Sequence, residues 1–70
     1  MNRKDIVNES GEKIGEVDGS VAYDASGYVY GSVAYFGGDI GYVSFAGTRV
    51  GGQTTGQLVP QDNGTMLLTD

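Results

Sequence analysis

The residue types that most often carry catalysis are absent or isolated in this sequence. It contains no histidine and no cysteine, so it lacks the commonest general base, the commonest zinc ligand and any thiolate nucleophile. No two acidic residues stand out as the carboxylate pair that glycoside hydrolysis requires. We therefore predict that the protein is not an enzyme, with no catalytic residue, no cofactor-binding residue and no cofactor.

The aspartates are the remaining candidates for holding a metal ion. Four of them stand singly along the chain, at Asp18, Asp24, Asp39 and Asp62. A calcium site needs six to eight converging oxygen ligands, which isolated carboxylates do not supply. An aspartate that begins a turn instead accepts hydrogen bonds from the backbone two residues on. We interpret all four as turn residues and predict no metal site.

A glycine-rich stretch from Gly47 to Thr54 contains the positive charge of Arg49 and is the best candidate for a phosphate-binding loop. It lacks the lysine of a P-loop, and no helix is expected to follow it. We therefore interpret this stretch as a structural turn.

The five tyrosines and two phenylalanines all lie between Tyr23 and Phe45. Side chains alternate between the two faces of a strand, so one thin core cannot bury all of them. Exposed aromatic clusters mark protein interfaces or platforms for sugars. The residues expected at an interface are Tyr28, Tyr35, Phe36, Tyr42 and Phe45. We predict a two-fold dimer built around Tyr35, Phe36 and Tyr42, with a glycan platform as the alternative.

Charge and length narrow the choice of partner. The 4 basic and 9 acidic residues give a net charge of −5, which disfavours nucleic acid and anionic membranes. The apolar runs are too short to span a membrane, and the first residues lack the apolar segment of a signal peptide. A cytoplasmic location is therefore expected. Because a chain of 70 residues without disulfides has a small core, we expect a homodimer or a higher homo-oligomer; any further protein or glycan partner is left open.

A short pattern recurs along the chain: a glycine, two variable residues, a larger apolar residue, a second glycine, one variable residue and usually valine. It defines four repeats, near residues 6–17, 21–33, 34–43 and 44–53. The paired glycines of the successive copies are Gly11 and Gly15, Gly27 and Gly31, Gly37 and Gly41, and Gly47 and Gly51. Repetition of this kind indicates that these glycines are structural.

The two glycines of each copy have different expected roles. The first follows a polar turn, as in Asn8–Gly11 and Asp24–Gly27, where glycine accepts a positive φ. The second lies inside the next strand, where glycine indicates a bulge or the close approach of another backbone. We predict bulges or close packing contacts at Gly15, Gly31 and Gly41.

These patterns predict an all-β fold of short hairpin repeats, pseudo-symmetric, with glycine-rich turns and without significant helix. Residues 1–70 are expected to form a single β-repeat domain. The expected strands cover residues 4–8, 13–17, 20–24, 28–36, 39–46 and 48–53, and a loop follows over residues 54–57. A strand or hairpin over residues 58–69 completes the domain, and Pro60 is expected to end its strand or to lie on an edge.

The stretch Val21–Val33, which contains the second pair of glycines, resembles the repeat of the four-fold β-flower proteins, a family of small uncharacterised bacterial proteins. Ile6–Val17 is similar in the same register, so the resemblance extends over about residues 6–53. It implies hairpin petals around a pseudo-symmetric centre, and it implies no catalytic or ligand-binding residue.

A second resemblance rests on Ser10–Val17, which is similar to the opening of a PRC-barrel domain, a small β-barrel that serves as an adaptor module. Val59–Pro60 resembles a later part of that family, but the barrel does not account for the repeats at Gly27, Gly37 and Gly47. We therefore expect a non-catalytic structural or interaction module that acts as a homo-oligomer. The alternatives are a glycan-binding module that uses exposed aromatics and a PRC-barrel-like adaptor.

Overall fold

The computed structural model describes residues 3–38, 40–45 and 54–69. Within these ranges the chain forms seven strands and no helix, which confirms the all-β prediction; accordingly, this part of the chain has no helix long and apolar enough to cross a membrane. The strands are β1 (Lys4–Val7), β2 (Lys13–Asp18), β3 (Val21–Asp24), β4 (Val29–Gly37), β5 (Ile40–Phe45), β6 (Thr55–Pro60) and β7 (Met66–Thr69). Outside the described residues lie the strand expected over residues 48–53, Asp39, Gly47, Arg49 and Gly51.

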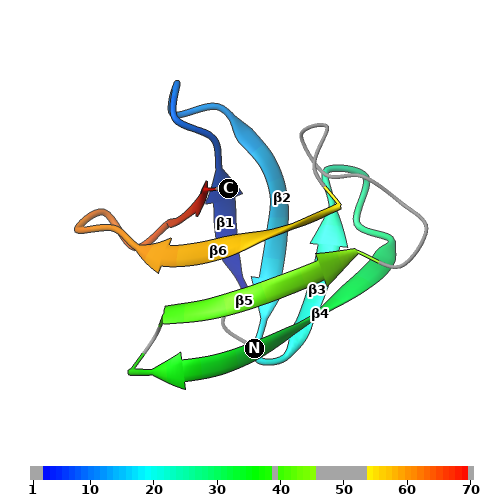
Figure 1. The fold of residues 1–70 in the computed structure, drawn as a ribbon. Helices are drawn as coiled ribbons and strands as arrows, with labels where there is room; N and C mark the ends of the chain where they lie inside the picture. Colours follow the sequence, from blue (N-terminus) through cyan, green and yellow to red (C-terminus); the bar gives the residue numbers. More distant parts are fainter. Residues whose placement is uncertain (1–2, 39, 46–53, 70) are drawn as a thin grey trace.

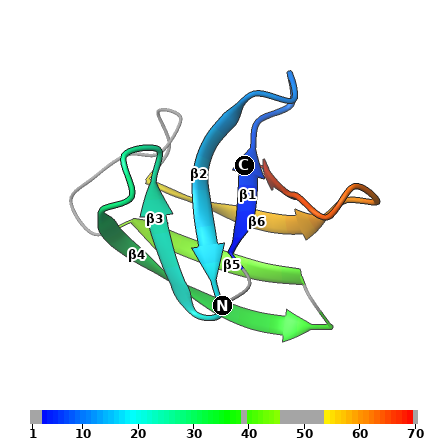
Figure 2. The same ribbon diagram turned by 180° about the vertical axis from the view of Figure 1, so that it is seen from behind.

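The strands close into a barrel in which each one pairs antiparallel with the next along the chain (Figure 1). The barrel closes where β1 pairs in parallel with β7, with Ile6 opposite Met66 and Val7 opposite Leu67. Figure 2 shows from behind that β1 lies beside the C-terminal end of the chain. Closure pairs two strands that would otherwise expose unpaired backbone groups at the edges of the sheet.

Apolar side chains from every strand fill the interior of the barrel. The buried residues are Ile6, Val17, Ala22, Val33, Val43, Phe45, Leu58, Met66 and Leu68. Several of the larger ones face a glycine across the strand pair: Ile6 lies opposite Gly15. Leu58 lies opposite Gly41 in the same way. Since seven short strands enclose little space, a glycine opposite a large side chain makes room for it.

Gly31 and Gly41 leave no space for a side chain. A Cβ atom added at Gly31 would lie 2.8 Å from Phe45 Cδ1 and against the carbonyl oxygen of Ser44. One added at Gly41 would lie 2.6 Å from Val33 Cγ1. The close packing contacts predicted for these two glycines are therefore confirmed.

Two of the predicted bulges lie directly before the second glycine of a repeat. The β1–β2 register shifts at Ile14, before Gly15, and the β3–β4 register shifts at Tyr30, before Gly31. Each bulge inserts one residue that has no partner and changes the face to which the preceding residues point. Ile14 can therefore pack against the core, although it stands three positions before the buried Val17.

The β1–β2 and β3–β4 turns are built in the same way. The Oδ1 atoms of Asn8 and Asp24 each accept hydrogen bonds from the backbone N–H groups two and four residues later, at 2.9–3.0 Å. Gly11, with φ +82°, and Gly27, with φ +89°, adopt the left-handed backbone that ends each turn. The turn glycines predicted at these two positions are confirmed, because an L side chain is strained at such angles.

The third turn glycine differs from the prediction by one residue. The repeat pattern places the positive φ at Gly37, but Gly38 adopts it, with φ +56°. The reason is a third register shift, at Phe36, which adds one residue to β4. Gly37 therefore ends the strand, opposite Ile40, and the turn begins one residue later.

The loop predicted over residues 54–57 is wrong over most of its length, because β6 begins at Thr55. The backbone N–H of Phe45 donates to the carbonyl oxygen of Thr54 at 2.7 Å, which extends the pairing of β5 and β6. Gly56, which suggests a loop in the sequence, is buried within β6. Pro60 ends β6, as predicted.

Candidate functional site

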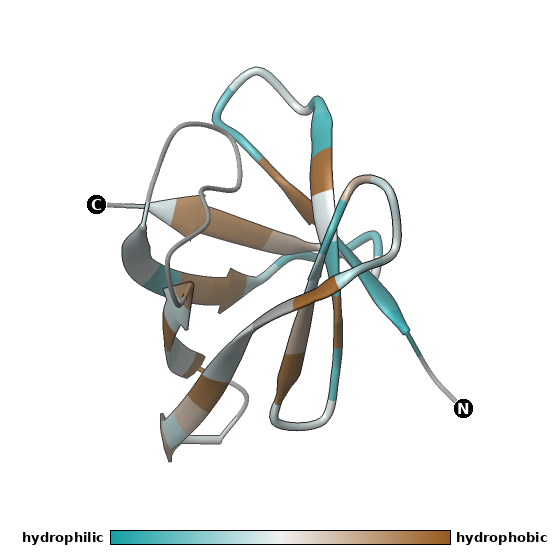
Figure 3. Cartoon of the chain, turned by 90° about the vertical axis from the view of Figure 1, so that its right-hand side faces the viewer, coloured by the Kyte–Doolittle hydropathy of each residue, from teal (hydrophilic) through white to brown (hydrophobic). Residues whose placement is uncertain are grey.

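The outer surface of the barrel has two parts of different chemistry. Strands β1–β3 contain six charged residues, at Lys4, Asp5, Lys13, Glu16, Asp18 and Asp24. Strands β4–β7 contain none. Figure 3 shows the hydrophilic colour at the N-terminal end of β1 and in turns. We call the outer surface of β1–β3 the charged face and that of β4–β7 the neutral face; residues of the neutral face that alternate with buried ones are Ser32, Ala34, Tyr42, Ser44, Thr55, Gln57, Val59 and Leu67.

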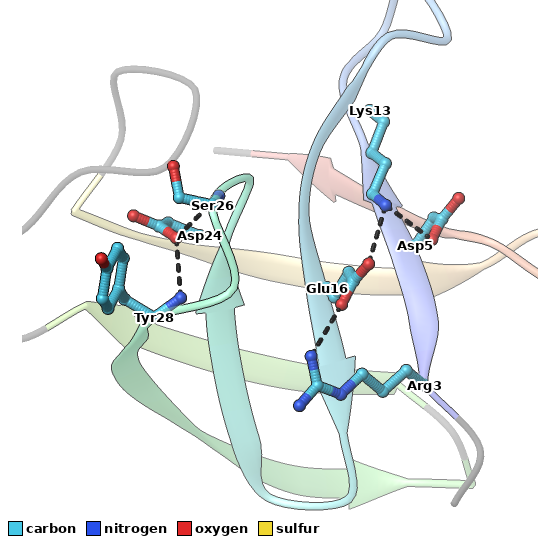
Figure 4. Close-up of polar contacts among 7 residues, drawn as sticks. All are labelled: Arg3, Asp5, Lys13, Glu16, Asp24, Ser26 and Tyr28. Atoms are coloured by element: carbon cyan, nitrogen blue, oxygen red, sulfur yellow. Dashed lines mark hydrogen bonds and ion pairs between the residues drawn. The ribbon is translucent and has the colours of Figure 1, made fainter.

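Four side chains of the charged face form a connected set of ion pairs (Figure 4). Arg3 Nη1 lies 3.0 Å from Glu16 Oε1, and Lys13 Nζ lies 2.7 Å from Glu16 Oε2. Lys13 Nζ also lies 3.6 Å from Asp5 Oδ1. The Arg3 guanidinium lies over the ring of Tyr23, 3.9 Å from its centroid. These contacts connect β1, β2 and β3 on the outside of the barrel.

The ion pairs favour the charged form of each group. Hydrogen bonds from Lys13 and from Arg3 lower the pKa of Glu16. The hydrogen bond to Glu16 raises the pKa of Lys13, and the charge of Asp5 adds to this effect. The same Glu16 carboxylate raises the pKa of Arg3. A general acid or base needs a pKa near neutral pH, and these shifts lead away from it, so the geometry supports a structural role for this network.

Tyr42 lies in the middle of the neutral face. It stands on β5, between Ala34 of β4 and Gln57 of β6, and 48% of it is exposed. The small side chain of Ala34 cannot cover the ring from the β4 side. Phe36 is 65% exposed because it is the unpaired residue of the β4 bulge. Both aromatics are therefore at the surface, as the sequence predicts.

Tyr35 is 43% exposed but also has a structural role. Its hydroxyl donates to the carbonyl oxygen of Gly19 at 2.6 Å. Its ring lies beside Gly41, where an added Cβ would be 3.1 Å from Cδ1. With Lys4 and Met66 it lines a cavity of about 310 Å³ where β1 and β7 begin. Tyr35 therefore connects β4 to the β2–β3 turn, and part of its surface is committed to that contact.

Phe45 is the predicted interface residue that the structure places in the core, with 3% exposed. No register shift interrupts β5 after Tyr42, so two residues three positions apart face opposite sides. Tyr28 is 64% exposed, but it precedes β4, whereas Phe36 lies near the other end of that strand. The structure thus places Tyr35, Phe36 and Tyr42 in one hairpin and separates the other two aromatics from them.

Among the described residues, no cluster of three or more histidine, cysteine, aspartate or glutamate side chains could hold a metal ion. Asp24 accepts its hydrogen bonds from the backbone N–H groups of Ser26 and Tyr28, as Figure 4 shows, and so acts as a turn residue. Asp62 lies in the turn between β6 and β7. These two aspartates therefore occupy turns, as predicted.

A row of hydroxyl side chains on the neutral face is not predictable from the sequence pattern alone. Ser32, Ser44 and Thr55 lie opposite one another on β4, β5 and β6. Their alternation with buried residues such as Val33 and Phe45 is visible in the sequence. The row itself is not, because it depends on which strands are neighbours and in which register they pair.

Comparison of the chain with protein-family models, with curated proteins and with solved structures finds no match. The neutral face, the charged face and the hydroxyl row are therefore the features from which a function can be inferred.

Proposed function

We propose that the chain is a non-catalytic interaction module that self-associates through its neutral face, with Tyr42 near the centre of the contact and Phe36 at its rim. The partner is a second copy of the same chain. A two-fold dimer is the commonest closed assembly and uses one surface patch on both copies. Such a patch has to be compatible with itself in shape and in charge.

The distribution of charge is the observation that carries this proposal. Each copy has a net charge of −5, so two copies repel each other at long range. Charged residues are depleted in the core of protein interfaces, since a buried charge without a partner is costly. Strands β4–β7 contain no charged residue. The neutral face is therefore where a second copy can pack without burying an unpaired charge from these strands.

The exposed aromatics supply the favourable free energy. Burying an aromatic side chain removes about 150–250 Å² from water, at about 25 cal/mol per Å². Since about half of Tyr42 is exposed and more of Phe36, covering each one contributes roughly 2–3 kcal/mol before the cost of association. That gain is large for a domain of 70 residues, whose net stability is of the order of 5 kcal/mol.

The size of the face is also sufficient. A stable dimer buries about 800 Å² on each partner, which is about a fifth of the 4127 Å² surface of this chain. The neutral face spans four of the seven strands of the barrel. A contact centred on β5 can therefore reach the required area without including the charged face.

Two further observations support a non-catalytic role. The carboxylates of Glu16 and Asp5 are engaged in ion pairs, and Asp24 holds a turn. The turns at Asn8 and Asp24 have the same hydrogen bonds, which supports the resemblance to the β-flower proteins. We propose this relation together with the role as an interaction module. Closure of the barrel supports the PRC-barrel-like adaptor as the alternative.

Sedimentation equilibrium and light scattering between micromolar and millimolar chain concentration test the proposal. We expect a mass of twice 7.3 kDa for the unmodified chain. Tyr42→Lys, alone or with Phe36→Lys, should give the mass of one chain. Ser10→Lys is the matched control, because it adds the same charge in the exposed β1–β2 turn and should leave the dimer intact.

Two outcomes would contradict the proposal. The unmodified chain could remain monomeric up to millimolar concentration, which would remove self-association altogether. Alternatively, a dimer that persists in Tyr42→Lys and in the double variant would place the contact on another surface.

A further inference from the structure

Strands β4, β5 and β6 form a groove at the end of the neutral face that is remote from Phe36. In Figure 1 the end of β5 lies beside the start of β6. Ser44, Phe45 and Thr55 line the groove, which places it at this end of the strand pair. Its volume is about 510 Å³, within the range of about 300–1,000 Å³ that is usual for small-molecule sites. Described residues that line it include Val29, Ser32, Ser44, Phe45, Thr54 and Thr55.

Hydroxyl side chains are among the described lining residues of this groove. Ser32 lies opposite Ser44, and Ser44 lies opposite Thr55, so the Cβ atoms of neighbours in this row are about 4.5–5.5 Å apart. Both serines are exposed, and among the described residues neither serine side chain has a hydrogen-bond partner. Each hydroxyl can donate one hydrogen bond and accept others. The two serines thus offer a pair of adjacent polar groups to a ligand.

Apolar groups are also among the described lining residues. Val29 is 61% exposed at the start of β4. Gly31 contributes backbone alone, and the ring of Phe45 lies against it. A groove lined by both hydroxyls and apolar atoms fits a ligand that has both kinds of surface.

The charge of the groove restricts the ligand further. None of its described lining residues is charged, and the chain as a whole is acidic, with a net charge of −5. From the described lining residues a phosphate or carboxylate would gain no ionic partner to replace its lost hydration. The ligand that fits is neutral and rich in hydroxyl groups, with an apolar face of C–H groups, and this is the chemistry of a sugar ring.

We propose that this groove binds a neutral carbohydrate, with Ser32 and Ser44 as its hydrogen-bonding residues and Val29 as its exposed apolar contact. The inference does not rest on the proposed self-association. Tyr42 and Ser44 are two residues apart on the same face of β5, about 7 Å, so a second copy that covers about 800 Å² around Tyr42 would also cover Ser44 and compete with the sugar. The sugar titration is therefore also run on Tyr42→Lys. Sugar binding and the mass of the assembly are measured separately, and either can fail alone.

Titration of the ¹⁵N-labelled chain with cellotetraose, maltotetraose and chitotetraose tests the proposal by NMR. We expect at least one of these sugars to shift the backbone signals of residues 29–32, 44–45 and 54–55, whereas the anionic tetragalacturonic acid leaves them unchanged. Absence of shifts with all three neutral sugars at millimolar concentration overturns the proposal. Shifts confined to other residues, or equal shifts with the anionic sugar, overturn it as well.

Paired variants test the role of the hydroxyl groups. Ser32→Val with Ser44→Val removes both hydroxyls and should weaken binding about tenfold, since two neutral hydrogen bonds are lost. Ser32→Thr with Ser44→Thr keeps both hydroxyls and should retain affinity within about threefold. Valine and threonine are both favourable in strands, and the dispersion of the NMR spectrum reports whether each variant folds.

If the valine pair fails to fold, Ser44→Ala alone should weaken binding about threefold. Unchanged affinity in a folded variant without these hydroxyls overturns the assignment of the two serines. Loss of affinity in the threonine pair equal to that in the valine pair also overturns it, because the hydroxyls are then not what the sugar recognises.

Discussion

The hairpins β1–β2 and β3–β4 are built alike in their turns and interior, but the outside of β4 differs from that of β1 and β2. In each hairpin one side-chain oxygen, of Asn8 or of Asp24, holds the turn between the two strands. Each also has a bulge directly before the second glycine of its repeat, Gly15 or Gly31. Both then bury a valine, Val17 or Val33. On the outside, β1–β2 carries ion pairs, whereas β4 contains no charged residue.

This difference separates two kinds of constraint on the sequence. The repeated residues of β1–β2 and β3–β4 are those that their turns and the narrow interior require. The outward residues are constrained much less by the fold, because solvent accepts most side chains on the outer face of a strand. The neutral face is therefore the part of the molecule in which a function can be sought.

The largest expected effect comes from filling the interior at Gly31. Gly31→Val should destabilise the fold by about 3 kcal/mol or more, because the new side chain meets the Ser44 carbonyl and the Phe45 ring. The melting temperature should fall by at least about 10 °C. Gly37→Val is the control, since nothing lies within 4 Å of its added Cβ. Equal melting temperatures for both variants would mean that the interior glycines are incidental to the repeat.

The next largest effect is expected on the neutral face, on the outside of β4–β7. If the neutral face is a dimer contact, the free energy of unfolding rises by up to about 1.4 kcal/mol for each tenfold increase in chain concentration, and the melting temperature rises with it. Tyr42→Lys should abolish this dependence, and Ser10→Lys should preserve it. Thermal unfolding followed by circular dichroism at several concentrations measures both. A melting temperature that does not depend on concentration in the unmodified chain speaks against the neutral face as an interface.

The two matching turns should respond alike to loss of their side-chain acceptor. Asn8→Ala and Asp24→Ala each remove an oxygen that accepts two backbone N–H groups, and each should cost about 1–2 kcal/mol. Urea unfolding measures both changes, with Ser26→Ala as a control that keeps the Asp24 oxygen. Costs that differ by more than about 1 kcal/mol would show that the two turns are alike in geometry but not in energy.

The smallest effect is expected on the charged face. Because the pKa of Glu16 is lowered in the folded state, its contribution is present above the ordinary glutamate pKa of about 4.3 and is lost as the pH falls through the lowered value. Unfolding of the unmodified chain and of Glu16→Gln should therefore differ at pH 7 and converge in acid. A difference that persists to the lowest pH would attribute the effect to packing and not to charge.

The local elements of this fold were readable from the sequence. Turn chemistry at Asn8–Gly11 and Asp24–Gly27 separates strands that the structure places close to their predicted bounds. The close contacts at Gly31 and Gly41 were predictable as well. A glycine weakens the interior of a strand, so its presence there indicates a bulge or the close approach of another group. These features depend on residues near one another in the chain, where φ preferences and side-chain size act directly.

Pairing between distant residues was decided by the tertiary structure. Met66 lies opposite Ile6 across the closure of the barrel, and no local signal in either segment specifies a partner so far along the chain. Register also decided the surface: Phe45 is buried and Tyr42 exposed because β5 has no shift between them. Strand side chains alternate with a period of two, so a single inserted residue moves every side chain that precedes it in the strand to the opposite face of the sheet. The sequence alone therefore determined the strands and turns, while strand neighbours and register determined which side chains form the core and which form the candidate site.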